Sequence, residues 1–234
     1  MLEKTPFDYT CNHCIQNSLP FAHEPILDTS EHQHDTYPQR SEPLLDTSEH
    51  HNGTVSQPLE THLDCFKSKG LHFIGLNARS LLPKISELRL FSQKAKPATI
   101  SVCETWLDDS ITDAEIELSG YSIERKDRNR QGGGVCPYIR NDLAYNKRSD
   151  LDTFDVESVW IHIHLPKTKP ILIASVYRPP NQTDFLNTLD ELLKSTEPSE
   201  EIYILGDTNI CLSKSNIGLA KSYLSLLNNN VFLS

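Results

Sequence analysis

From residue 71 onward, apolar and polar positions follow two recurring patterns. Short apolar or alternating runs predict strands at residues 71–76, 98–103, 120–125, 133–140, 156–165, 170–177 and 201–205. Apolar residues at helical spacing predict helices at residues 83–95, 183–194 and 216–227. The strands fall in groups between the helices, and several connections have hairpin length. This order favours an α/β fold, a four-layer α/β/β/α sandwich of two mixed sheets flanked by helices.

Residues 1–69 have a different texture. They are rich in proline, histidine, serine, threonine and glutamate, and no apolar period persists. Segment 24–32 recurs nearly intact as segment 42–50, and two copies are too few for a repeat structure. The region holds 4 Lys and Arg against 11 Asp and Glu, a net charge of −7 out of the chain's −10. We therefore predict a disordered acidic tail at 1–69 and one folded domain at 70–234.

Composition narrows the class of protein. No apolar run approaches the roughly 18–20 residues of a membrane span, and the first residues lack the order of a signal peptide. We therefore expect an intracellular protein, nuclear or cytoplasmic, that does not bind a membrane. A net charge of −10 argues against nucleic-acid binding through overall charge. Residues 125–148 nevertheless carry seven basic residues against two acidic ones, which suits a local contact with an anionic partner or a solvated loop.

Isolated polar residues follow three of the predicted strands. Asn77 follows the first strand, Glu104 follows the second, and Asp207 and Asn209 follow the last. Carboxylate and amide groups of this kind suit a site that handles a phosphate and a hydrated metal ion. Plainer interpretations are a turn cap at Asn77, a surface carboxylate at Glu104 and an Asx turn at Asp207. The coincidence of three strand ends favours a shared site.

A family resemblance lies in seven short stretches of the chain: 76–81, 104–110, 120–121 with 125–130, 132–135, 156–158, 176–181 and 206–209. Taken in this order, they resemble the endonuclease/exonuclease/phosphatase superfamily. The likeness is greater to the apurinic-type endonuclease domain of non-LTR, LINE-like retrotransposons. The resemblance implies hydrolysis of phosphodiester bonds in DNA with one Mg²⁺ ion and no obligate protein partner.

The resemblance also implies a role for each candidate residue. Glu104 would be the main carboxylate ligand of Mg²⁺, and Asn77 would orient the ion or the scissile phosphate. Tyr177 would donate a hydrogen bond to the phosphate, Asp207 would hold the attacking water, and Asn209 would position a phosphate oxygen. The basic residues expected to bind substrate are Arg178, Arg128 and Arg130.

Simpler roles stay open for several of these residues. Tyr177 could be core packing, and Arg178 with the two following prolines could be a rigid loop. The glycines at 132–134 more simply form a hairpin than a phosphate cradle, because no helix follows them.

One feature of the family has no counterpart in this chain. The resemblance implies a catalytic histidine well downstream of Asp207 and Asn209, but the last histidine is His164. Loss of general base catalysis costs about 10²–10⁴-fold in rate. We therefore expect a C-terminally truncated and catalytically incomplete DNA endonuclease or nickase of retrotransposon origin. The alternative is an inactive retroelement-derived module that binds nucleic acid or protein.

A weaker hypothesis concerns the tail. Cys11 and Cys14 have the spacing of a zinc-ligand pair, and several histidines lie nearby. A second such pair is missing, and Cys65 stands alone.

Overall fold

The computed structural model describes residues 66, 69–197, 201–212 and 218–231. The expectations for residues 1–65, namely the disordered tail, its duplication and the Cys11–Cys14 zinc site, lie outside the described residues. Within the described part, no helix combines the length and apolar character that a membrane crossing needs.

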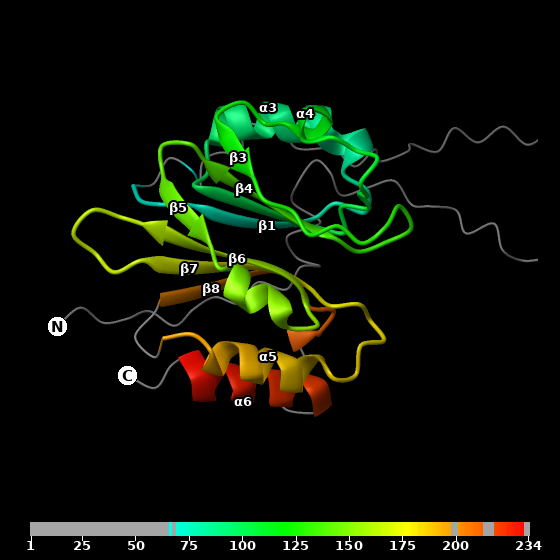
Figure 1. Ribbon diagram of the computed structural model, residues 1–234, viewed down its shortest axis with the longest axis vertical. Coiled ribbons are helices and arrows are strands. Elements are labelled where there is room, and N and C mark those ends of the chain that lie inside the picture. Colours follow the sequence, from blue (N-terminus) through cyan, green and yellow to red (C-terminus); the bar gives the residue numbers. More distant parts are fainter. Residues whose placement is uncertain (1–65, 67–68, 198–200, 213–217, 232–234) are drawn as a thin grey trace, which may run out of the picture.

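The first sheet has four strands in the order β1-β2-β4-β3 (Figure 1). Strand β1 runs parallel to β2, whereas β4 pairs antiparallel with both β2 and β3. A short 3-10 helix, Leu82–Lys84, leads into α3, and α3 and α4 cover the outer face of this sheet. The bounds are β1 Phe73–Asn77, α3 Ile85–Ala95, β2 Thr99–Cys103, α4 Asp113–Ile116, β3 Tyr121–Ile123 and β4 Val135–Arg140.

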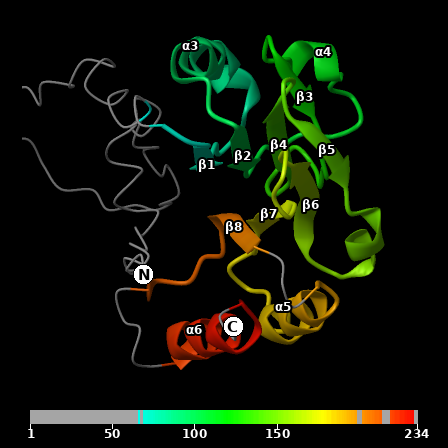
Figure 2. The same ribbon diagram turned by 90° about the vertical axis from the view of Figure 1, so that its left-hand side faces the viewer.

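The second sheet has the order β5-β6-β7-β8, with β7 and β8 parallel and the other pairs antiparallel. Helices α5 and α6 cover its outer face, opposite the helices of the first sheet (Figure 2). The bounds are β5 Ala144–Lys147, β6 Glu157–His164, β7 Ile171–Tyr177, α5 Phe185–Lys194, β8 Glu201–Asp207 and α6 Gly218–Val231. The expected four-layer arrangement of two mixed sheets between helices is confirmed.

Strand β6 shows how the layers bury the chain. Val159, Ile161 and Ile163 face the first sheet, as their alternation predicts. Trp160 points the other way and is also fully buried, packed beneath α5. Its indole Nε1 donates a hydrogen bond to Ser158 Oγ at 2.9 Å. Both faces of this strand are therefore covered, as a sheet between two other layers requires.

Three short elements were not predicted from the hydrophobic pattern of the sequence. Helix α4 is a single turn, held by a reciprocal capping box between Thr112 and Glu115. Strand β5 contains little apolar sequence and forms because it pairs with β6, with Tyr145 opposite Ile163. The 3-10 helix Ser149–Thr153 connects these two strands. Strand β5 therefore depends on its neighbour in the sheet, whereas α4 depends on a cap within its own turn.

The two sheets approach closely where β1 passes β8. The rings of Phe73 and Tyr203 lie 5.1 Å apart, centroid to centroid. A Cβ atom added to Gly75 would lie 3.2 Å from the backbone nitrogen of Gly206. Gly206 itself has a φ of +133°, and a Cβ there would lie 1.9 Å from the Val176 carbonyl oxygen. Glycine is therefore required at position 206, directly before Asp207.

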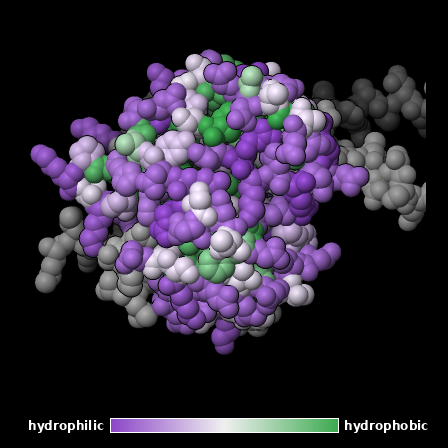
Figure 3. Space-filling view, in the orientation of Figure 1, coloured by the Kyte–Doolittle hydropathy of each residue, from purple (hydrophilic) through white to green (hydrophobic). Residues whose placement is uncertain are grey.

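The surface seen in Figure 3 is mostly hydrophilic, with small separate apolar patches. Among the described residues, the large apolar side chains that are exposed are Leu90 and Leu219. Single exposed leucines of this kind are ordinary on a folded domain and do not by themselves indicate a partner.

Candidate functional site

Two rows of paired residues bring the candidate side chains to one edge of the sandwich. In the second sheet, Glu157 pairs with Tyr177, and Tyr177 pairs with Asp207. In the first sheet, Asn77 pairs with Cys103, the residue before Glu104. Strands β1, β2, β7 and β8 all end at this edge, and β6 begins there. Polar residues that follow different strands are thereby gathered in one place.

An amide and two carboxylates form the centre of the site. The Nδ2 group of Asn77 donates hydrogen bonds to Glu104 Oε1 at 3.0 Å and to Asp207 Oδ2 at 2.7 Å. The three residues are half-buried. The backbone N–H of Arg79 donates to Asn77 Oδ1 at 3.2 Å, which fixes the orientation of the amide. The structure therefore brings together three residues that follow separate strands in the sequence. We call Asn77, Glu104 and Asp207 the edge cluster.

The donor set at this edge suits a hard divalent cation. Mg²⁺ keeps several waters and binds through one or two carboxylates, which is what Glu104 and Asp207 offer. Softer metals prefer histidine and cysteine. In the described part of the chain, no group of three or more His, Cys, Asp and Glu residues is arranged to hold a metal ion. By their chemistry, the carboxylate oxygens of Glu104 and Asp207 fit Mg²⁺ better than a softer transition metal.

Backbone strain is concentrated beside these side chains. Seven described non-glycine residues have positive φ, and five of them lie in the loops that follow β1, β2 and β8. Such conformations cost about 1–3 kcal/mol each and persist where the surroundings impose them, often at functional sites. The five are Arg79 (+42°), Ser80 (+77°), Glu104 (+51°), Trp106 (+53°) and Asn209 (+51°).

Tyr177 is almost fully buried, 5% exposed. Burial, together with the negative charge of Glu104, raises the pKa of Tyr177 to about 12. The cation of Arg128 acts in the opposite direction. The phenol therefore stays protonated at neutral pH and can donate a hydrogen bond.

Asp207 and Asn209 form a turn as well as lining the site. The backbone N–H of Asn209 donates to Asp207 Oδ1 at 2.9 Å, which is the Asx turn considered from sequence. The other carboxylate oxygen, Oδ2, accepts the bond from Asn77. Asn209 Nδ2 donates to the Arg178 carbonyl oxygen at 2.7 Å. The turn and the cluster are therefore compatible, because each uses a different oxygen of Asp207.

The sequence predicted that Arg178 contacts the substrate. In the structure, its side chain is buried and holds the loops around the site together. It is only 6% exposed, and its guanidinium donates to the carbonyl oxygens of Gln182 at 2.8 Å and Thr208 at 3.3 Å. Its Cζ atom also lies 5.8 Å from the Phe185 ring centroid. These contacts join the loop after β7 to the loop after β8. The N–H groups that would bind a phosphate are engaged by the backbone.

Arg128 and Arg130 lie on the β3–β4 hairpin, whose turn contains the predicted glycines. Asn129 and Gly132 form an isolated bridge there, so the hairpin interpretation of the glycines is confirmed. Arg128 Nη1 forms an ion pair with Glu157 Oε1 at 2.8 Å, and its Cζ atom lies 5.9 Å from the Tyr177 ring centroid. Arg130 is exposed. Of these two arginines, Arg128 is the one that lies beside a predicted site residue, Tyr177.

Glu157 was not predicted as a site residue. Its carboxylate accepts hydrogen bonds from Arg128 and from the backbone N–H of Gly134, the latter at 2.7 Å. The available signal was its place at the start of a predicted strand, directly after Val156 in one of the segments of the family resemblance. That position does not by itself indicate a site. The strand register does, because it pairs Glu157 with Tyr177.

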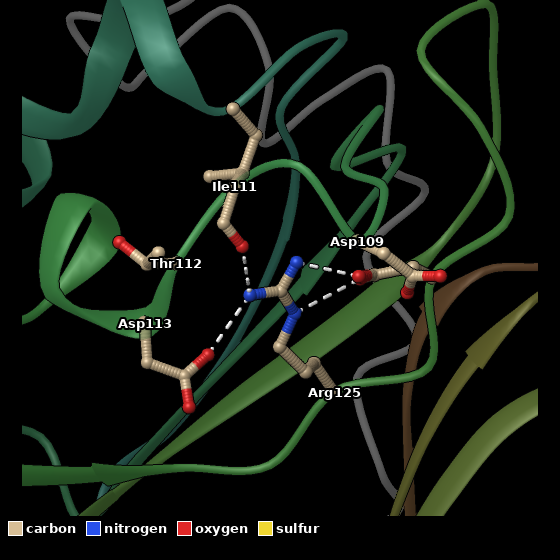
Figure 4. Close-up of a pocket in the computed structure, with 6 residues that line it drawn as sticks. Asp109, Ile111, Thr112, Asp113 and Arg125 are labelled. Atoms are coloured by element: carbon tan, nitrogen blue, oxygen red, sulfur yellow. Dashed lines mark hydrogen bonds and ion pairs between the residues drawn. The ribbon is translucent and has the colours of Figure 1, made fainter.

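A separate open pocket lies on the side of the first sheet, at the base of the same hairpin. Arg125 occupies it, donating to the Ile111 carbonyl and to Asp113 Oδ1, each at 2.8 Å (Figure 4). It also pairs with Asp127 through two hydrogen bonds. The pocket contains none of the strand-end residues. The contacts of Arg125 anchor the hairpin to the loop before β3. The residues that line the pocket are Asp109, Ile111, Thr112, Asp113, Arg125 and Asp127.

The described histidines lie away from the cluster. His162 and His164 are five and seven residues along β6 from Glu157, and His72 precedes β1, at the opposite end of that strand from Asn77. The imidazole that the family resemblance implied is therefore not supplied by a described residue.

The observed fold, two mixed sheets between two layers of helices, is the arrangement that the sequence predicted. The structure is similar to the "Endonuclease domain of TRAS1, a telomere-specific non-LTR retrotransposon", with a TM-score of 0.53 and 15% identity over 68% of this chain and 70% of that one. It is also similar to the AP endonuclease LMAP from Leishmania major, with a TM-score of 0.55 and 16% identity over 68% and 66%. For an AP endonuclease from Archaeoglobus fulgidus, the TM-score is 0.50 at 15% identity, over 68% and 71%.

These similarities concern the fold. Comparison with protein-family models found no match, and comparison with curated protein sequences found none either. The matched part spans between 66% and 71% of the length of the three structures. What those proteins do is therefore a basis for a proposal about this chain.

Proposed function

We propose that the edge cluster binds Mg²⁺ and hydrolyses phosphodiester bonds in DNA, which makes the chain a DNA endonuclease or nickase of retrotransposon origin. The observation that carries the proposal is the Asn77 amide, which bridges Glu104 and Asp207 from different sheets. The fold is shared with nucleases that include a retrotransposon endonuclease domain, and this supports a DNA substrate.

Glu104 and Asn77 would hold the cation, with Asp207 facing them. The ion, when bound, would polarise a phosphate oxygen and lower the pKa of a bound water. Asp207, which has one carboxylate oxygen turned to Asn77, would orient the attacking water. The hydrogen bond from Asn77 Nδ2 holds the Glu104 carboxylate toward the cluster before substrate arrives.

Tyr177 and Asn209 would bind the phosphate itself. The raised pKa of Tyr177 keeps its hydroxyl protonated, so it can donate a hydrogen bond to an oxygen that gains charge in the transition state. Asn209 Nδ2 uses one hydrogen on the Arg178 carbonyl, and an amide carries a second for a phosphate oxygen. Arg178 thus acts by positioning Asn209. Arg128 and the exposed Arg130 would contact the DNA backbone.

A second candidate function is a nucleic-acid-binding module without turnover. The favouring observation is that no described histidine lies at the edge, so proton transfer from the nucleophile has no imidazole partner among the described residues. Absence of a general base typically lowers a rate by about 10²–10⁴-fold. If the site does cleave DNA, we therefore expect cleavage to be slow.

The test is nicking of supercoiled plasmid by the purified chain, with Mg²⁺ and with EDTA. We expect slow nicking that requires the ion and is abolished by Glu104→Gln and by Asp207→Asn. The matched control is Asp142→Asn, which removes a surface carboxylate paired with Arg140 away from the cluster. DNA binding without nicking at any enzyme concentration would favour the binding module. Nicking that survives both cluster substitutions would refute the assigned site.

A further inference from the structure

We propose that Glu157 is a positioning residue, which holds the Arg128 guanidinium against Tyr177 so that its cation binds the substrate phosphate. This inference rests on the proposed function and assigns a role to a residue that touches neither the cluster of Asn77, Glu104 and Asp207 nor the bond that breaks.

The first observation is the division of labour between the two oxygens of Glu157. Oε1 accepts from Arg128 Nη1 at 2.8 Å, and Oε2 accepts from the Gly134 backbone N–H at 2.7 Å. One carboxylate therefore joins the arginine to the turn from which β4 begins. Arg128 Nε donates to the Gly132 carbonyl at 2.9 Å, so the guanidinium is held from two directions. A planar fork held in this way loses little freedom when it binds a phosphate.

The second observation is the space that the turn leaves for this pair. A Cβ atom added to Gly133 would lie 2.4 Å from Arg128 Nε and 2.5 Å from Glu157 Oε2. The φ of Gly133 is +69°, which also favours glycine. The glycine turn is therefore shaped around the ion pair. This gives the glycines a function other than cradling a phosphate directly.

The third observation is the position of the pair relative to the site. Glu157 and Tyr177 are paired residues on β6 and β7, and the Arg128 Cζ atom lies 5.9 Å from the Tyr177 ring centroid. The side chain of Glu157 is 17% exposed and that of Arg128 is 38% exposed. The carboxylate is thus covered while part of the cation stays open to solvent. An isolated surface ion pair would show neither the adjacent phenol nor this asymmetry.

The base of the hairpin is fixed independently. Arg125, three residues before Arg128, donates hydrogen bonds to Asp113 and to the Ile111 carbonyl. These bonds tie the base of the hairpin to the loop before β3. The position of Arg128 therefore depends on its own contacts with Glu157 and Gly132, not on a mobile hairpin. Removing the Glu157 charge should release the guanidinium without detaching the strand.

The experiment measures binding of a fluorescent DNA duplex to the full chain in EDTA, together with hydrogen exchange of the Arg128 Nε–H group by NMR. The variants are Glu157→Gln and Arg128→Lys, with Asp142→Asn as the control that removes an equivalent carboxylate–arginine pair. The Nε–H signal is assigned by its absence in the lysine variant.

Two explanations of Glu157 predict opposite results for Glu157→Gln. If Glu157 positions Arg128, the variant binds the duplex about tenfold more weakly, the size of one charge-assisted hydrogen bond, and Nε–H exchange accelerates. If Glu157 is only an acidic residue near the DNA, removing its charge tightens binding. Tighter or unchanged binding with a protected Nε–H group would overturn the proposal.

A second variant covers the case in which Glu157→Gln does not fold. Arg128→Lys keeps the net charge but loses the fork, so we expect binding about tenfold weaker than wild type. Unchanged affinity of this variant would also overturn the proposal. Both measurements need neither metal nor turnover. If the wild type does not nick plasmid, the proposed enzymatic activity is refuted, but the proposed role of Glu157 is not.

Discussion

The side-chain amide of Asn77 lies 2.7 Å from Asp207 Oδ2, although 130 residues of chain separate them. Asn77 ends β1 of the first sheet, and Asp207 ends β8 of the second. One hydrogen bond therefore links the two sheets at the candidate site. The same amide also bonds Glu104, so the spacing of the two carboxylates depends on a neutral donor between them.

Changing Asn77 to Asp should make stability depend strongly on Mg²⁺. Three carboxylates would then meet without a donor, and repulsion at this range costs about 2–4 kcal/mol at an intermediate effective dielectric constant. We expect a lower free energy of unfolding at pH 8 in EDTA, largely restored by saturating Mg²⁺ or by acid. Urea unfolding measured with and without the ion checks this.

Asn77→Leu is the matched control, because it removes the donor without adding charge. Its loss should be about 1–3 kcal/mol, the cost of leaving hydrogen-bonding groups unpaired, and acid should restore less of it. If Mg²⁺ stabilises neither wild type nor Asn77→Asp, no cation binds at this edge.

The pKa of Tyr177 predicts a loss of stability in alkali. The folded state holds this proton more tightly, with a pKa of about 12 against an unfolded value near 10. The contribution is complete below pH 10 and is lost as pH rises toward 12, because the unfolded chain then releases the proton first. Tyr177→Phe should therefore show a shallower fall in stability over this window.

Phenolate absorbance during a pH titration checks the same assignment. Burial also raises the pKa values of Tyr121 and Tyr203 to about 12, so wild type should show a late titration phase from several rings. Tyr177→Phe should reduce the amplitude of that late phase. A reduction in the early phase, near pH 10, would contradict a hydroxyl that is buried beside the Glu104 charge.

Gly206→Ala should destabilise the fold severely and displace Asp207. The added Cβ would meet the Val176 carbonyl oxygen at 1.9 Å, and the backbone φ of +133° is also unfavourable for alanine. Gly120→Ala separates these two effects, since φ is +84° there but nothing lies within 4 Å. We expect about 1–2 kcal/mol for Gly120→Ala and more than about 3 kcal/mol for Gly206→Ala in urea unfolding. Equal losses would show that Gly206 does not lie against the Val176 carbonyl of the neighbouring strand β7 as described.

Two buried serines should respond in opposite ways to alanine. Ser158 Oγ accepts the Trp160 indole N–H, so Ser158→Ala leaves a buried donor unpaired at a cost of about 1–3 kcal/mol. Ser175 is fully buried between the sheets, and its hydroxyl has no hydrogen-bond partner among the described residues. Ser175→Ala should therefore be neutral or stabilising. Urea unfolding followed by tryptophan fluorescence distinguishes the two.

Local pattern was sufficient for most of the fold. Alternation in β6 predicted Val159 and Ile161 on one face and Trp160 on the other, and helical spacing predicted α3 and α5. Pattern failed for β5, where Tyr145 is held by pairing with β6, and for α4, a single capped turn. Such elements are too short to carry a period of their own.

What the sequence determined by itself is which residues end the strands. Asn77, Glu104 and Asp207 follow apolar runs, and that order is a local property of the chain. Their convergence was decided by tertiary structure. Gly75 lets the first sheet approach the backbone of the second at Gly206, and strand register places Asn77 beside Cys103 and Asp207 beside Tyr177. The environments of Arg178 and Glu157 were decided there too. Arg178 donates to the carbonyl of Thr208, and Glu157 accepts from Arg128 on the β3–β4 hairpin. These partners are distant in the sequence, so no local pattern specifies them.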